Sequence, residues 1–395
     1  MISVSEAKEI IKNNIKVLAA VMLPLADASG HVLAASIYAP FDIPAFDQSS
    51  MDGYAIRFAD YAASKDTITI TGEMAAGSPL QIEIKSGETA RIFTGAPLPK
   101  GADTVVMQEK VQLENKTIIF KDNALTKGAH VRLKGAEIMA GSLAMPKGGI
   151  LSPAAIGFLA GIGIASVLVY PMPTVSIIIT GNEFQKPGNE LLFGQVYESN
   201  SLSLSAVLQQ AGIKNCSIFY AADDLLAVKN SLQKALLKSD MVLLTGGVSV
   251  GDYDFVVRAA ELCGVQQQFH KVKQKPGKPI YFGTFNNKIV FGLPGNPASV
   301  LSCFYNYVLL AIDLLSGKNI FHKVVEAKLT KGYAKPPGLT HFLKGKYYDG
   351  FAMPLTAQES FRLSSFAEAD CLICLQEDHA DYAEGEKVTV YLLPH

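Results

Sequence analysis

The most constraining feature of the sequence is a regular alternation of strand-like and helix-like runs between residues 173 and 318. Short apolar runs bounded by turn residues predict strands, and longer runs with helical spacing predict helices. Strands are expected at residues 174–180, 216–220, 240–245, 265–270 and 288–292, and helices at 200–211, 223–238, 252–263 and 297–316. This order is typical of a doubly wound, three-layer α/β domain with a mostly parallel sheet, which binds ligands at the carboxyl ends of its strands.

The segments that flank this domain have a different pattern. Residues 38–137 contain short strand-like runs separated by Gly and Pro turns, which predicts a β-rich domain. Its strands are expected at residues 67–71, 90–93, 104–108 and 117–120. Residues 319–395 return to short strands and indicate a terminal β barrel or sandwich. Residues 3–20 predict a helix, because Ser3 and Glu6 form a capping box ahead of helically spaced apolar residues.

One stretch raises the question of a membrane span, because residues 148–182 contain no Asp, Glu, Lys or Arg. A span needs about 20 apolar residues on one helix. Here a shorter helix is predicted from Ser152 to about Gly163, followed by strands at residues 166–170 and 174–180. We therefore expect buried elements and no membrane association. The start, MISVSEAKEI, lacks the pattern of a signal peptide, so a cytoplasmic protein is expected.

Composition argues against two broad classes of protein. The charged fraction is only 18% and the apolar fraction 49%, which argues against a disordered chain. The net charge of −1 argues against binding nucleic acid through overall positive charge. Cys371 and Cys374 form a C-x-x-C motif, which suggests a redox or zinc site. A strand would turn the two sulfurs to opposite sides, so two buried free thiols are the favoured interpretation.

Two strand ends lead into tight turns that could hold an anion. The sequence LLTGGVSVGDYD, residues 243–254, contains Gly residues whose backbone N–H groups could cradle a phosphate. Its Asp252 and Asp254 either hold a divalent cation or cap the next helix. The second turn, in VFGLPGNPASV at 290–300, would lie beside the first if both strands share a sheet. Lys275 and Lys278, in KPGKP, suit phosphate, with a solvated basic turn as the alternative.

Acidic residues also follow predicted strands. Glu183 comes after the first strand of the α/β domain, where carboxylates often bind metal or substrate. Asp223 and Asp224 open a helix, so helix capping is their alternative role. In the β-rich part, the segment PAFDQSSMDGYAI contains Asp52, and Thr94 stands at another strand end. These polar groups either bind a ligand or form turns.

Taken together, these segments resemble the MoeA family of molybdopterin molybdenumtransferases, which includes the gephyrin E domain. The matching segments occur in family order along nearly the whole chain: PAFDQSSMDGYAI, RIFTGAPLP, VRLKGAEI, LSPAAIGFLAGIGI, TGNEFQKPG, TGGVSVGDYDF, KPGKP and GLPGNPAS. The resemblance implies an elongated discontinuous domain at 1–37 and 138–172, a β-rich domain at 38–137, a molybdopterin-binding α/β domain at 173–318 and a β barrel at 319–395. It also implies a homodimer whose cleft lies between the α/β domain of one chain and the β-rich domain of the other. A molybdopterin adenylyltransferase and acceptor molybdoenzymes are possible partners.

The resemblance further implies a reaction, in which adenylylated molybdopterin and molybdate give molybdenum cofactor and AMP with the help of Mg²⁺. The catalytic residues it implies are Asp52, Thr94, Glu183 and Asp254, with Mg²⁺ held by Glu183, Asp223 and Asp254. The substrate-binding residues it implies are Asp223, Gly246, Gly247, Ser249, Gly251, Lys275, Lys278, Pro294, Gly295, Asn296 and Pro297.

Two positions depart from the family pattern. Asn182 stands where the family usually has Asp, and Glu137 stands where the family has a shorter Asp. Both changes could alter metal geometry. The alternatives are therefore a non-catalytic pterin-binding or scaffold protein on the same fold, and a hydrolase of ordinary nucleotides.

Overall fold

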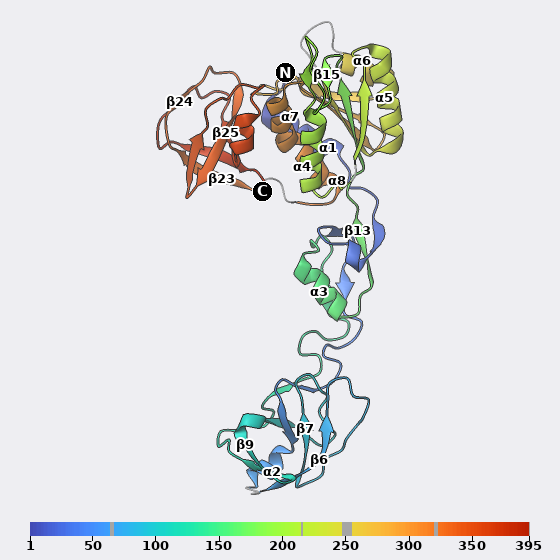
Figure 1. Cartoon of the computed structure of the whole chain (residues 1–395), viewed down its shortest axis with the longest axis vertical. Coiled ribbons are helices and arrows are strands. Elements are labelled where there is room, and N and C mark those ends of the chain that lie inside the picture. Colours follow the sequence, from blue (N-terminus) through green and yellow to red (C-terminus); the bar gives the residue numbers. More distant parts are fainter. Residues whose placement is uncertain (64–66, 215, 247–254, 320–322, 395) are drawn as a thin grey trace. The chain divides into compact units, whose positions relative to one another are not determined.

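The computed structural model describes residues 1–63, 67–214, 216–246, 255–319 and 323–394 (Figure 1). The chain forms two compact units. The larger unit comprises Met1–Leu23, Gly30–Ala34 and Leu168–His395, and the smaller comprises Pro24–Ser29 and Ala35–Val167.

A six-stranded sheet, in the order β17-β14-β18-β22-β21-β19, forms the centre of the larger unit. Its strands are β14 (Val175–Thr180), β17 (Cys216–Ala221), β18 (Met241–Thr245), β19 (Gln266–His270), β21 (Tyr281–Phe285) and β22 (Lys288–Leu293). The first four strands in this order are parallel, and β21 and β19 are antiparallel to their neighbours. All five predicted strands are present. The short β21 was not expected, because it lies between the KPGKP turn and the tight turn at Asn286-Asn287.

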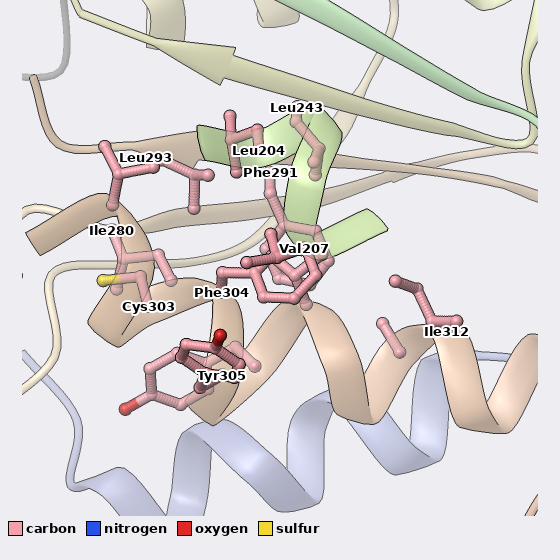
Figure 2. Close-up of a cluster of buried hydrophobic side chains, with 14 of the residues drawn as sticks. Leu204, Val207, Leu243, Ile280, Phe291, Leu293, Cys303, Phe304, Tyr305 and Ile312 are labelled. Carbon is pink, nitrogen blue, oxygen red and sulfur yellow. The ribbon is translucent and has the colours of Figure 1, made fainter. Parts of the chain in front are cut away.

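Helices cover both faces of this sheet, because alternate strand residues are apolar on both sides. One face is covered by α1 (Val4–Asn14), α4 (Asn200–Gln210), α7 (Pro297–Cys303) and α8 (Leu309–Leu315), the last two joined by the π-helical η3 (Phe304–Val308). Figure 2 shows this core around Phe291 and Phe304. The other face is covered by α5 (Leu225–Lys238) and α6 (Phe255–Leu262). The three-layer doubly wound fold is thus confirmed.

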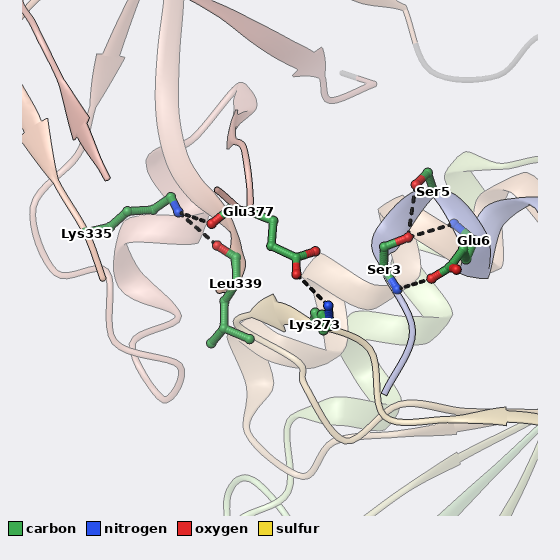
Figure 3. Close-up of polar contacts among 7 residues, drawn as sticks. All are labelled: Ser3, Ser5, Glu6, Lys273, Lys335, Leu339 and Glu377. Carbon is green, nitrogen blue, oxygen red and sulfur yellow. Dashed lines mark hydrogen bonds and ion pairs between the residues drawn. The ribbon is translucent and has the colours of Figure 1, made fainter. Parts of the chain in front are cut away.

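The N-terminal helix is shorter than expected and packs elsewhere than expected. It begins after Ser3, whose hydroxyl accepts a hydrogen bond from the Glu6 N–H at 3.2 Å, while the Ser3 N–H donates to the Glu6 carboxylate at 2.7 Å (Figure 3). The chain leaves the helix at Ile15, in extended conformation. Ala7 and Ile11 are fully buried in the α/β core, and not against the 138–172 segment with which the resemblance groups residues 1–37.

A closed five-stranded barrel follows the α/β domain, in the order β25-β26-β23-β29-β27 with β27 returning to β25. Its strands are β23 (Val324–Leu329), β25 (Thr340–Tyr348), β26 (Phe351–Pro354), β27 (Cys371–Leu375) and β29 (Lys387–Leu392). The ammonium group of Lys273 binds the Glu377 carboxylate at 2.7 Å and so ties the α/β domain to the barrel (Figure 3). Cys371 and Cys374 are buried free thiols on β27, as expected.

The smaller unit contains a second six-stranded sheet, in the order β8-β5-β7-β6-β10-β9. Its strands are β5 (Gly53–Ile56), β6 (Ile68–Met74), β7 (Glu88–Ile92), β8 (Thr104–Met107), β9 (Val111–Glu114) and β10 (Thr117–Phe120). The four strands predicted between residues 67 and 120 are all present. The helix α2 (Phe58–Ala62) lies between β5 and β6 in the sequence.

The uncharged stretch folds as predicted, into α3 (Pro153–Gly161), β13 (Ser166–Tyr170) and β14. The Ser152 hydroxyl accepts a hydrogen bond from the Ala155 N–H at 3.2 Å and caps α3. Within the described residues, one helical segment, Pro297–Leu315, is long and apolar enough to cross a membrane. This segment is the core helix α7-η3-α8, and 89% of its most apolar 18-residue stretch is buried inside the protein.

The remaining elements are short. They are β1 (Val21–Pro24), η1 (Leu25–Asp27), β2 (Val32–Leu33), β3 (Ile37–Tyr38), β4 (Gln48–Ser49), η2 (Gln108–Lys110), β11 (Val131–Arg132), β12 (Leu143–Met145), β15 (Phe184–Gln185), β16 (Val196–Tyr197), β20 (Gln274–Lys275), β24 (Tyr333–Ala334), α9 (Ser364–Glu368) and β28 (Asp381–Tyr382).

Candidate functional site

A pocket of about 760 Å³ opens at the carboxyl ends of the parallel strands. Each of the four parallel strands is followed by a pocket residue that the sequence analysis named as a candidate site residue. Asp223 follows β17, Glu183 follows β14, Gly246 follows β18, and Gly295 follows β22. This is where a doubly wound fold is expected to bind its ligand.

The chemistry of the pocket changes along the order of the strands. The carboxylates of Asp223 and Glu183 lie at the β17-β14 end, and the Pro-Gly-Asn-Pro turn lies at the β22 end. A neighbouring pocket of about 350 Å³ is also lined by Asn296, and its other lining residues include Lys275 and Lys278. Negative groups therefore lie at one end of a continuous surface and positive groups at the other.

The strands that lead into the two predicted turns are neighbours in one sheet, and Thr245 of β18 pairs with Leu293 of β22. Gly246 and Gly295 therefore lie close together, and a Cβ added at Gly295 would be 3.7 Å from the Gly246 Cα; the rest of the first turn, from Gly247, lies outside the described residues. Gly246 has φ +86°, in the left-handed region that favours glycine. A Cβ atom added there would lie 2.3 Å from the Thr180 carbonyl oxygen. The close approach of β14 and β18 at the pocket floor thus requires glycine at this position.

Asn200, at the start of α4, is a pocket residue that the sequence analysis missed. Its side-chain amide donates to the Thr245 hydroxyl at 3.0 Å and to the Gly295 carbonyl at 2.9 Å. Asn200 therefore bridges the ends of β18 and β22. The sequence signal was weak, because an Asn at a helix start is ordinarily interpreted as a cap.

The two described carboxylates interact across the pocket. Burial raises the pKa of Asp223 above its ordinary value, and the negative charges of Glu183 and Asp224 raise it further. The Asp223 N–H donates to the Asn182 side-chain oxygen at 3.3 Å. The acceptor of this bond is therefore the amide oxygen of Asn182, at a position where the family usually has a carboxylate.

The raised pKa of Asp223 gives a stability prediction. Because the folded protein holds this proton more tightly than the unfolded chain, ionising Asp223 costs stability as pH rises through the raised pKa. We expect Asp223→Asn to raise the unfolding temperature by about 1–2 °C at pH 7 without metal. The gain should vanish as pH falls toward 4. Calorimetry of both proteins across this pH range measures it, and a variant that is less stable at pH 7 would contradict it.

Buried residues beneath the Lys275–Lys278 turn fix its backbone. Gly277 has φ +85°, and a Cβ there would lie 2.4 Å from the Cys303 sulfur. The fully buried Gln274 donates to the Gly277 carbonyl at 3.0 Å and accepts a hydrogen bond from the Tyr307 hydroxyl. The lysines therefore start from a fixed backbone, which suits anion binding better than a flexible surface turn does.

The barrel contributes to this basic region. Lys275 pairs with His341 of β25, and both line a further pocket of about 280 Å³. Burial lowers the pKa of His341 to about 4, and the charges of Lys275 and Lys335 add to the effect. His341 is therefore neutral at pH 7, so the positive charge of this pocket belongs to Lys275.

In the smaller unit, Asp52 and Thr94 form a hydrogen-bonded pair, which the sequence analysis did not predict. The Thr94 N–H and hydroxyl both donate to one oxygen of the Asp52 carboxylate, at 2.8 and 2.7 Å. These bonds, with the charge of Arg91, hold the pKa of Asp52 below its ordinary value. Asp52 is therefore ionised at neutral pH, with one oxygen bound and the other able to accept. Glu137 is exposed in the same unit, with its N–H bonded to the Ile43 carbonyl.

We expect Thr94→Val to raise the pKa of Asp52, because the hydroxyl donor is lost while the backbone donor remains. Thr94→Ser keeps the hydroxyl and should leave this pKa close to that of the unmodified protein. An NMR titration of carbon-labelled Asp side chains measures the change. Equal pKa values in the Val and Ser variants would show that the hydroxyl does not stabilise the carboxylate.

Several predicted site residues lie outside the described residues: Gly247, Ser249, Gly251, Asp252 and Asp254. The larger unit brings together Glu183, Asp223, Gly246, Pro294, Gly295, Asn296 and Pro297, with Lys275 and Lys278 in the adjoining pocket. Asp52 and Thr94 belong to the smaller unit.

The donor set is compatible with Mg²⁺. In the part of the chain that the structure describes, no three His, Cys, Asp or Glu residues gather in a way that could hold a metal ion by themselves. Mg²⁺ is typically bound by one or two carboxylates together with substrate phosphates and water. Glu183 and Asp223 supply such a pair, and their mutual repulsion would be relieved by a cation.

Comparisons with known proteins cover the whole chain. The family models that match are the MoeA N-terminal region (domain I and II) over residues 2–163, a probable molybdopterin binding domain over 176–313 and the MoeA C-terminal region (domain IV) over 326–393. A molybdopterin molybdenumtransferase from Haemophilus influenzae is 34% identical over 382 residues, 94% of each chain. One from Nostoc sp. is 34% identical over 93% of this chain and 87% of its own.

Solved structures agree with these matches. A molybdopterin biosynthesis MoeA protein from Pyrococcus horikoshii is 31% identical, covers 99% of both chains and gives a TM-score of 0.82. A second structure of a MoeA protein from this organism is 30% identical over both whole chains, with a TM-score of 0.79. Likeness of this extent, in sequence and in fold, shows that the chain belongs to the MoeA family.

Proposed function

We propose that this protein is a transferase of molybdenum cofactor biosynthesis, which inserts molybdate into adenylylated molybdopterin and releases AMP. The observation that carries the proposal is the order of groups along the pocket and the pocket beside it: two carboxylates, then Gly246 and the Pro-Gly-Asn-Pro turn, then two lysines. A dinucleotide-like substrate with a central pyrophosphate needs this sequence of metal, backbone and cationic contacts. The match to molybdopterin molybdenumtransferases supports the same substrate.

Each end of the pocket has a distinct role in this proposal. Glu183 and Asp223 hold Mg²⁺, which when bound offsets the charge of the phosphates. The turns at Gly246 and Gly295 let the substrate approach the backbone closely. Lys275 and Lys278 offset the remaining negative charge. Catalysis is then mainly positioning and electrostatic stabilisation, as in other phosphoryl transfers.

The central experiment measures AMP release from adenylylated molybdopterin in the presence and absence of molybdate and Mg²⁺. We expect release that requires both ions. A protein that binds the substrate tightly without turnover would support a pterin-binding scaffold, and cleavage of ordinary nucleotides without pterin would support a hydrolase. Either result would overturn the proposal.

We further propose a homodimer in which Asp52 and Thr94 of one chain act with the α/β pocket of the other. The family resemblance of the sequence supports this arrangement, and neither Asp52 nor Thr94 is among the residues that line the α/β pocket. Mixing Asp52→Ala and Glu183→Gln chains tests this arrangement. Random pairing would restore about a quarter of the normal activity, because half of the dimers then contain one intact site out of two. No recovery after verified exchange of subunits would place all the residues in one chain.

We also propose that the protein works in the cytoplasm without membrane or nucleic acid, and that it exchanges pterin with a molybdopterin adenylyltransferase and with acceptor molybdoenzymes. The net charge of −1 supports the absence of nucleic-acid binding through overall positive charge. Cell fractionation tests the location, and cross-linking in cells that make molybdenum cofactor tests the partners. Recovery in the membrane fraction would contradict the proposed location.

A further inference from the structure

A chain of buried hydrogen bonds connects the Lys275–Lys278 turn to the core helix. Its central member is Gln274, which is fully buried. The Gln274 side-chain nitrogen donates to the Gly277 carbonyl at 3.0 Å and to the Cys303 sulfur at 3.6 Å. The Gln274 side-chain oxygen accepts a hydrogen bond from the Tyr307 hydroxyl. Both polar atoms of this side chain are therefore engaged, one by the turn and one by the helix.

The surrounding groups fix the direction of each bond. The Gly277 carbonyl can only accept, so the Gln274 nitrogen faces the turn and the Gln274 oxygen faces Tyr307. Burial raises the pKa of Tyr307 well above its ordinary value, so the hydroxyl keeps the proton that it donates. The chain of bonds therefore has one arrangement at neutral pH.

The core helix departs from α-helical geometry where it contacts Gln274. Residues Phe304–Val308 form a π-helical turn, in which a backbone N–H donates to the carbonyl five residues earlier. Such turns are rare and are often found at functional sites. Cys303, which Figure 2 shows in the core, and Tyr307 both contact Gln274 from this part of the helix.

The lysine turn lies directly against these residues. A side chain at Gly277 would meet the Cys303 sulfur, and the Val272 N–H donates to the Lys278 carbonyl at 3.0 Å on the other side of the turn. A group held in place before its ligand arrives loses less freedom on binding than a mobile one. The position of the turn therefore bears on anion affinity.

We propose that Tyr307 is a positioning residue for the lysine turn: through Gln274, its hydroxyl fixes the backbone from which Lys275 and Lys278 reach the phosphates of the substrate. Both lysines line the pocket of about 350 Å³ beside the α/β pocket. This proposal rests on the proposed function, because that reaction supplies the pyrophosphate group.

Binding of inorganic pyrophosphate and of adenosine to the full chain tests the proposal. Tyr307→Phe removes the donor to the Gln274 oxygen and frees the turn to move. We expect pyrophosphate to bind about 5–20-fold more weakly, because the lysines are no longer held in place. Adenosine carries no phosphate and should change by less than about 2-fold. An unchanged affinity for pyrophosphate, or an equal loss for adenosine, would overturn the proposal.

Tyr305→Phe is the matched control. Tyr305 is a buried tyrosine of the same π-helical turn, and its ring stacks on Phe366 with 6.1 Å between centroids. The bonds of the Gln274 side chain go to Tyr307, Gly277 and Cys303. Tyr305→Phe should therefore leave pyrophosphate affinity within about 2-fold of normal.

A second substitution separates affinity from stability. Gln274→Met removes the oxygen that Tyr307→Phe leaves unpaired, and replacing both partners of a buried hydrogen bond by apolar groups is close to neutral for stability. The double variant should therefore unfold at a higher temperature than Tyr307→Phe and still bind pyrophosphate as weakly. A purely structural role of Tyr307 predicts that affinity recovers together with stability, and that result would refute the positioning role.

A double-mutant cycle tests whether Tyr307 acts through the lysines. In a Lys278→Met background, Tyr307→Phe should weaken pyrophosphate binding by a smaller factor than in the unmodified protein, because one of the two groups that it positions is gone. Equal factors in both backgrounds would show that Tyr307 does not act through the turn. Weaker pyrophosphate binding by Tyr307→Phe, with no AMP release from any form of the protein, would refute the proposed reaction and leave the positioning role standing.

Discussion

Replacing Glu183 with Gln is expected to lower the rate of AMP release by about 10²–10³-fold, the usual cost of removing one preorganised electrostatic group from an active site. The substitution keeps the shape of the side chain and removes one of the two described carboxylates. A metal site with fewer charged oxygen ligands binds Mg²⁺ more weakly. We therefore also expect half-maximal activity to require a higher Mg²⁺ concentration. Initial rates across a Mg²⁺ titration separate the two effects.

Glu190→Gln is the control for this loss. Glu190 is an exposed carboxylate between β15 and β16, a few residues beyond Glu183, and it does not line the pocket. This variant carries the same change in net charge and should stay within about 2-fold of normal activity. A Glu183→Gln variant with normal rate and normal Mg²⁺ dependence would remove Glu183 from the proposed metal site.

Gly246→Ala is expected to lower both stability and ligand affinity. The left-handed backbone at this position costs an alanine about 1–2 kcal/mol. In addition the new Cβ would lie 2.3 Å from the Thr180 carbonyl oxygen, so β14 and β18 must move apart at the pocket floor. We expect the unfolding temperature to fall by more than about 4 °C and AMP to bind more than about 10-fold more weakly. Calorimetry and titration with AMP measure these changes.

Gly188→Ala separates the cost of the left-handed backbone from the effect of the close contact with Thr180. Gly188 has φ +94°, close to the value at Gly246, but a Cβ there would meet nothing within 4 Å. This variant should show the backbone cost alone, with little change in AMP affinity. If Gly246→Ala is no more harmful than Gly188→Ala, the close contact with Thr180 is not what requires glycine in the turn.

The periodicity of the sequence predicted most of the α/β domain correctly. Apolar runs such as residues 175–180 and 241–245 are buried on both sides of the sheet, and continuous hydrophobic runs of this length indicate central parallel strands. The strand β21 was missed because its residues, YFGTF, lie between two turns. The uncharged stretch was interpreted correctly because Ser152 and Pro153 mark a helix start in any context.

Long-range contacts were less predictable. Asn200 contacts Gly295, which is 95 residues away, and nothing in the local sequence indicates this pairing. The packing of α1 on the α/β core was not expected either, because a capping box predicts where a helix begins and not what it packs against.

The sequence by itself determined the order of elements, the glycine and proline turns after strands, and the carboxylates and lysines that mark the site, because these depend on local backbone preferences and on residue chemistry. Only the tertiary structure decided which residue bridges the ends of β18 and β22. It brought Glu183 and Asp223 close enough to shift a pKa, and it buried the Asn200 oxygen with no hydrogen-bond partner among the described residues. These features arise from the register of strands far apart in the chain, and register is set by packing of the whole core.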